Sequence, residues 1–121
     1  IILPAKNDSL MVKYASRAFF DELLSAGVEI HQFHGGLLHT KSLVIDEKMA
    51  LVGTVNLDRR SFWLNFEMTM LIDNKNFAGE LLRTQMHYTL ASKQVSLEKW
   101  RQRSFFKRLL ESIIYLFSPL L

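Results

Sequence analysis

The chain has 121 residues and a mass of 14.1 kDa, which is the size of a single domain. Its content of 49% hydrophobic and 22% charged residues excludes an intrinsically disordered protein. The absence of cysteine excludes disulfide scaffolds and zinc–thiolate sites. The longest apolar run, Leu109 to Phe117, is interrupted by Glu111 and Ser112 and is shorter than the roughly 18–20 apolar residues of a membrane span.

Charge is distributed unevenly along the chain. Residues 1–92 carry nine basic and ten acidic side chains, a balance of −1, whereas residues 93–121 carry six basic and two acidic side chains, a balance of +4. We therefore divide the chain into a neutral body, residues 1–92, and a basic tail, residues 93–121. The first residues are apolar and do not include a methionine, so we expect the chain to be part of a longer protein.

The first third of the chain predicts a strand, a helix and a strand. Ile1–Pro4 has the composition of a strand end, and Asn7–Ser9 offers side chains that can cap a helix. Apolar residues then recur at spacings of three and four, which predicts an amphipathic helix over residues 10–26. Gly27 is suited to end that helix, and Val28–Phe33 predicts the second strand.

The rest of the chain predicts three strands followed by two helices. The strands are expected at Leu37–Ile45, Met49–Val55 and Phe66–Ile72. Phe77–Tyr88 predicts a helix, and Leu97–Phe117 predicts another that is bent or interrupted near Ser104. The expected fold is α/β, a mixed β-sheet flanked by helices.

The most informative pattern lies in the expected hairpin. Residues two apart on a strand share a face, so His39 and Lys41 point the same way and Leu43 continues that face toward the core. A turn over residues 46–49 would pair residues whose numbers sum to 95, placing Lys41 opposite Thr54 and His39 opposite Asn56. An imidazole, an ammonium, an amide and a hydroxyl then converge on one patch.

That set of groups suits a phosphate ester. Lys41 supplies charge for the phosphoryl oxygens, while Thr54 and Asn56 donate hydrogen bonds to them. A histidine can attack phosphorus or transfer a proton, because histidine titrates near neutral pH. No carboxylate cluster or glycine-rich loop accompanies these residues, so we expect no metal ion and no cofactor. Gly53 leaves room for a close approach of a ligand or a neighbouring backbone.

Two acidic residues complete the candidate site. Glu67 lies among apolar residues of the next strand, and we expect it to fix the orientation of the catalytic histidine; the alternative is that an arginine, Arg59 or Arg60, neutralises it. Asp46 lies at the turn and points away from the His39 face by parity, which favours a structural role.

The combined pattern resembles the signature of the phospholipase D superfamily. It consists of His39-x-Lys41-x4-Asp46, followed by Gly53-Thr54-x-Asn56, and Glu67 falls where the superfamily places the acid that orients its histidine. The stretch from Asn56 to Glu67 is similar to the segment that follows the second such motif in bacterial cardiolipin synthases. The similarity extends to both ends of the chain and implies a phospholipase D-like half domain with His39, Lys41, Asp46 and Glu67 as catalytic residues.

The resemblance implies an enzyme with two such motifs. One histidine forms a phosphohistidine and the other protonates the leaving alcohol, so that two phosphatidylglycerols yield cardiolipin and glycerol. This chain holds one motif, so the partner is expected to be a missing N-terminal half or a second copy of the chain. The implied location is the cytoplasmic side of the bacterial inner membrane.

Two other functions are compatible with the sequence. A nuclease of the superfamily that acts as a dimer should carry basic residues around its motif, but the balance of −1 over residues 1–92 argues against nucleic acid as a partner. An inactive truncated fragment is the second alternative. The tail, with an apolar stripe beside Lys107 and Arg108, is either a packing helix or a helix lying on an anionic membrane.

Overall fold

The computed structural model describes residues 1–6, 14, 16–56 and 66–116. These residues form two three-stranded sheets and four helices, so the predicted mixed α/β class is confirmed. The strands are β1 (Ile2–Pro4), β2 (His31–Phe33), β3 (Lys41–Ile45), β4 (Met49–Gly53), β5 (Thr69–Asp73) and β6 (Ser92–Gln94); the helices are α2 (Phe20–Ser25), α4 (Lys75–Leu90), α5 (Leu97–Arg101) and α6 (Phe105–Leu116).

The first sheet has the strand order β1-β2-β6. β1 and β2 are parallel, and the helical segment between them makes the crossover that parallel neighbours require. β6 pairs antiparallel with β2, with His31 opposite Gln94 and Phe33 opposite Ser92. β6 was not predicted from the sequence, because three residues reading Ser-Lys-Gln carry no strand-like apolar pattern.

Gly27 ends α2 as predicted. Its φ of 85° is left-handed, a conformation that glycine adopts without a steric penalty. The Gly27 N–H donates to the Leu24 carbonyl and the Val28 N–H to the Leu23 carbonyl, which are the two hydrogen bonds of a Schellman motif. The expected helix over residues 10–26 is broken by a turn at residues 18 and 19, and the proposed cap at Asn7–Ser9 lies outside the described residues.

The hydrophobic core lies between the first sheet, α2 and α5. Phe20, Ile30 and Trp100 are buried together, and the Phe20 and Trp100 rings are 4.7 Å apart. The Arg101 guanidinium contacts the Asp21 carboxylate at 3.1 Å across the same pair of helices. Residues 93–101 of the basic tail therefore belong to the same folded unit as the body, because β6 pairs with β2 and Trp100 packs in the core. The division at residue 92 stays a proposal about function.

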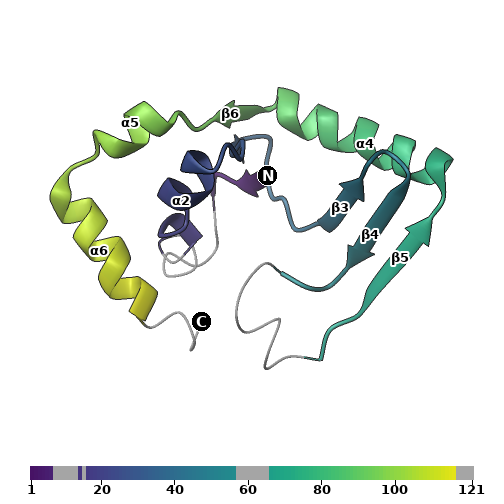
Figure 1. Cartoon of the computed structure of the whole chain (residues 1–121), viewed down its shortest axis with the longest axis horizontal. Coiled ribbons are helices and arrows are strands. Elements are labelled where there is room, and N and C mark those ends of the chain that lie inside the picture. Colours follow the sequence, from purple (N-terminus) through teal and green to yellow (C-terminus); the bar gives the residue numbers. More distant parts are fainter. Residues whose placement is uncertain (7–13, 15, 57–65, 117–121) are drawn as a thin grey trace.

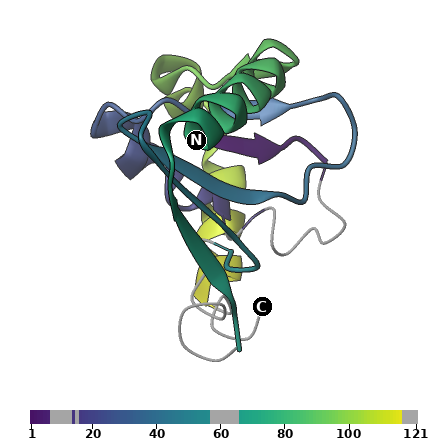
Figure 2. The same cartoon turned by 90° about the vertical axis from the view of Figure 1, so that its right-hand side faces the viewer.

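The second sheet is an antiparallel meander in the order β3-β4-β5, and α4 packs along it (Figures 1 and 2). α4 covers the face that contains Ser42 and the fully buried Ala50, and the Gln85 amide donates to the Ser42 hydroxyl at 3.1 Å. The opposite face of the sheet is exposed to solvent: the side chain of Leu43 is 53% exposed and that of Leu71 is 62% exposed. The expectation that Leu43 leads into the core is wrong, because α4 lies on the other side of the sheet.

The register of the β3–β4 hairpin differs from the expected one. Ile45 pairs with Met49 and Lys41 with Gly53, so paired numbers sum to 94 and not 95. Three residues, Asp46 to Lys48, form the loop, with left-handed φ values of 50° at Asp46 and 56° at Glu47. The expected pairing of Lys41 with Thr54 is therefore wrong, since an odd loop length shifts the partner strand by one residue.

The helices after the second sheet follow the predictions more closely. The Asn74 side chain caps α4 by accepting the Phe77 N–H at 3.0 Å. The expected helix over residues 97–117 is divided into α5 and α6 by residues 102–104, which confirms the interruption predicted near Ser104. Within the part of the chain that the structure describes, no helix is long and apolar enough to cross a membrane.

Candidate active site

Four of the motif residues, His39, Lys41, Gly53 and Thr54, lie where β3 begins and β4 ends. His39 lies exposed just before β3, and Lys41, half-buried, is the first residue of that strand. The Lys41 ammonium donates a hydrogen bond of 3.0 Å to the His39 backbone carbonyl, which holds the lysine close to the histidine. Directly opposite Lys41 is Gly53, the last residue of β4.

Gly53 is required here by a close approach of β5. A Cβ atom at this position would lie 2.7 Å from both Cα and Oγ1 of Thr69 and closer still to the Met68 carbonyl oxygen. Any side chain would therefore push β4 and β5 apart at the end of the strands next to Lys41. The glycine was expected to allow such an approach, and the neighbour is the backbone of β5.

Thr54 links β4 to the segment that carries Glu67. Its hydroxyl donates to the Glu67 carboxylate at 2.5 Å and accepts the Met68 N–H at 3.0 Å. Its backbone N–H donates to the Met68 carbonyl at 2.9 Å. The threonine was expected to bind substrate phosphate, and its role in holding Glu67 was missed. The sequence offered one signal for this structural role. Thr54 follows a glycine at a strand end, and Ser and Thr side chains in such places often form hydrogen bonds to the neighbouring backbone.

Two further predicted site residues lie apart from this cluster or at its edge. Asp46 lies at the far end of β3 from Lys41, in the left-handed loop, a conformation that aspartate adopts more readily than most residues. Asn56 is exposed, two residues after Thr54. Arg59 and Arg60, the alternative partners of Glu67, lie outside the described residues.

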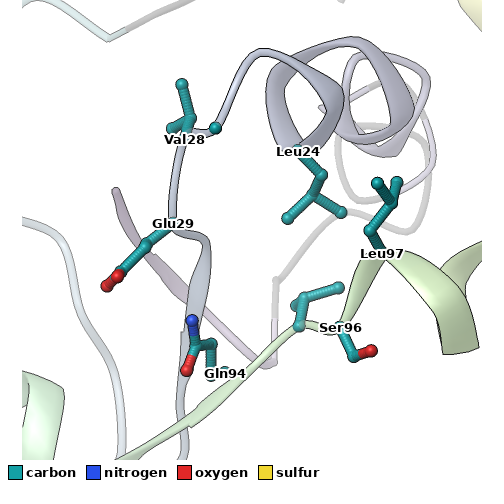
Figure 3. A pocket seen from close by; sticks show the side chains of 8 residues that line it. Leu24, Val28, Glu29, Gln94, Ser96 and Leu97 are labelled. Carbon is teal, nitrogen blue, oxygen red and sulfur yellow. The ribbon is translucent and has the colours of Figure 1, made fainter.

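The described residues contain a pocket, but it does not include the motif. It is lined by residues near the end of α2 and by the segment between β6 and α5, including Leu24, Glu29, Gln94 and Leu97 (Figure 3). No group of three or more His, Asp or Glu side chains able to hold a metal ion occurs among the residues that the structure describes. The candidate site is an exposed sheet end with two bonded pairs, Lys41 with the His39 carbonyl and Thr54 with the Glu67 carboxylate.

Comparison with known proteins agrees with the motif. Residues 1–87 match the family described as "Cardiolipin synthase, PLD-like domain". The whole chain is 55% identical to cardiolipin synthase A of Wigglesworthia glossinidia brevipalpis, 56% to that of Cronobacter sakazakii and 55% to that of Klebsiella pneumoniae.

The relatives are much longer than this chain. All of its residues align, yet they cover only 24–25% of each relative, so the chain spans about a quarter of their length. No solved structure matches. On the family match over residues 1–87, the chain belongs to the phospholipase D-like domain family of cardiolipin synthases.

Proposed function

We propose that this chain is the C-terminal catalytic half of a bacterial cardiolipin synthase, a phosphatidyltransferase that acts on phosphatidylglycerol. The observation that carries the proposal lies at the β3–β4 end, where Lys41 is bonded to the His39 carbonyl and pairs with Gly53, the residue before Thr54. The 55% identity to proteins named cardiolipin synthase A supports the substrate class.

The proposed reaction has two transfers at one phosphorus. A histidine nitrogen attacks the phosphorus of one phosphatidylglycerol, the P–O bond to the headgroup glycerol breaks, and the second histidine gives the leaving glycerol its proton. A glycerol hydroxyl of a second phosphatidylglycerol then loses its proton to that histidine and attacks the phosphohistidine. The P–N bond breaks, and cardiolipin is formed.

Each described residue has a specific role in this proposal. Lys41 neutralises the phosphoryl oxygens during both transfers, and its ammonium is held by the backbone carbonyl of His39. Glu67 orients His39 and is itself held by the Thr54 hydroxyl. Asn56 donates to the phosphate, and Asp46 shapes the hairpin. His39 acts as either the nucleophile or the acid.

The second histidine is proposed to come from another part of the protein or from a second copy of the chain. The chain corresponds to a quarter of the length of its relatives, which leaves room for a second motif elsewhere. We further propose that the enzyme works at the cytoplasmic surface of the inner membrane, where its lipid substrate resides. The reaction uses no metal ion and no nucleic acid.

The test combines the chain with the remainder of the protein. Phosphatidylglycerol in mixed micelles is incubated with the chain alone, with the upstream part alone, or with both, and cardiolipin and glycerol are measured by mass spectrometry. We expect little turnover from either part and equal amounts of the two products from the mixture, since half of an acid–base pair loses most of the rate. Full activity from a demonstrable monomer of this chain would overturn the two-motif proposal.

A further inference from the structure

α6 is an amphipathic helix whose apolar side is exposed and whose acidic residue is buried. Phe106 is 79% and Leu109 45% exposed, whereas Glu111 is only 4% exposed. Glu111 follows Leu109 by two positions, about 200° around the helix axis, so it lies on the opposite side. The exposed apolar residues are Phe105, Phe106, Leu109, Leu110 and Ile113.

A buried ion pair fixes this orientation. The Arg103 guanidinium contacts the Glu111 carboxylate at 2.6 Å, and both side chains are largely buried. The same guanidinium lies 3.2 Å from the centre of the Trp100 ring and donates to the Trp100 carbonyl at 2.9 Å. Since Trp100 belongs to the hydrophobic core, Arg103 connects α6 to the core of the body.

In a globular protein the apolar side of an amphipathic helix is usually buried, whereas the apolar side of α6 is exposed. From this arrangement we infer that α6 is a membrane-docking helix, with its apolar side inserted at the surface of an anionic bilayer. The only acidic residue of α6 is withdrawn from that surface and neutralised by Arg103, so it does not repel anionic headgroups.

Charge indicates which surface covers the apolar side. Arg101 is paired with Asp21 and Arg103 with Glu111, which leaves Lys93, Lys99, Lys107 and Arg108 against Glu98 in residues 93–121. This excess of positive charge matches an anionic lipid surface and is unfavourable between two copies of the same segment. The inference that lipid covers the apolar side of α6 also rests on the proposed function, in which the substrate is an anionic phospholipid. Binding to vesicles requires no turnover, so the two proposals fail separately.

The test exploits the absence of cysteine from the chain. A single cysteine is introduced at an exposed apolar position of α6, as Leu109→Cys, and labelled with a polarity-sensitive dye. The matched control is Leu90→Cys at the end of α4, where the leucine is 84% exposed. Circular dichroism first establishes that both labelled chains are folded as the unlabelled one is.

Vesicles of phosphatidylglycerol and phosphatidylcholine are then titrated into each labelled chain. We expect a blue shift of the α6 label that saturates with lipid, quenching by brominated acyl chains, weaker binding to pure phosphatidylcholine, and little change of the α4 label. Lys107→Gln with Arg108→Gln should weaken the preference for anionic vesicles. Equal shifts at both positions, no shift at either, or a blue shift that depends on protein concentration without lipid would each overturn the inference.

Discussion

Replacing Gly53 by alanine tests the close approach of β4 and β5 beside Lys41. The added Cβ would lie 2.7 Å from Thr69 Cα, whereas ordinary contact begins at 3.4 Å. The two strands must therefore separate by at least about 0.7 Å at this backbone atom, and by more at the Met68 carbonyl oxygen, which lies closer still. That displacement acts on Met68, whose N–H is bonded to the Thr54 hydroxyl, and hence on the support of Glu67.

The expected cost follows from the size of this clash. Overpacking by one methyl group against backbone destabilises proteins by about 1–3 kcal/mol. The same substitution in α4, Gly79→Ala, places its Cβ in open space and should stabilise the chain by about 0.5–1 kcal/mol, because glycine lowers helix stability. The two variants differ by one methyl group each and should shift stability in opposite directions.

Urea unfolding of the full chain, followed by far-ultraviolet circular dichroism, measures both changes. The Gly53→Ala midpoint should fall and the Gly79→Ala midpoint should rise, at an unchanged slope of free energy against urea. In the complete enzyme, Gly53→Ala should also lower turnover, whereas Gly79→Ala should not. A Gly53→Ala chain as stable as the parent would refute the close approach of β5.

The remaining predictions concern catalysis, the threonine bridge and the core. His39→Ala and Lys41→Ala should each abolish phosphatidyl transfer in the complete enzyme without altering its circular dichroism. Glu67→Gln should lower turnover less than His39→Ala because the imidazole stays in place. Chelators should have no effect on turnover. Loss of activity on chelation that added Mg²⁺ restores would contradict the proposed chemistry. Thr54→Val should cost about 1–3 kcal/mol in urea unfolding, since its hydroxyl makes two bonds worth about 0.5–1.5 kcal/mol each, while Thr54→Ser keeps both. Trp100→Ala should destabilise the chain by about 3–5 kcal/mol, a cost that Trp100→Phe largely avoids by keeping a ring against the core; equal stability of the alanine and phenylalanine variants would argue against this packing.

The elements with strong local signals were predictable from the sequence. The α/β class followed from apolar periodicities, and the end of α2 followed from Gly27, whose missing Cβ permits the left-handed φ of 85°. The break between α5 and α6 was also placed correctly. The motif that led to the family depends on residue types and spacing, which the sequence carries completely.

Features that depend on contacts between distant residues required the tertiary structure. The hairpin register changed by one residue because the backbone conformation of Asp46 and Glu47 decides the loop length, and two left-handed residues in succession have no distinctive sequence signal here. The sheet face that contains Leu43 is exposed because α4 covers the opposite face, and the sequence does not indicate which face a distant helix covers.

Long-range pairing likewise escaped the sequence. β6 is a strand because β2 offers it an unpaired edge, and its three polar residues would not form one alone. Helical periodicity alone places Glu111 on the polar side of α6, but only the Arg103–Glu111 contact shows that this side faces the body while the apolar side remains exposed. Local propensity and patterning are properties of neighbouring residues, whereas the face that an element buries is decided by residues far away in the chain.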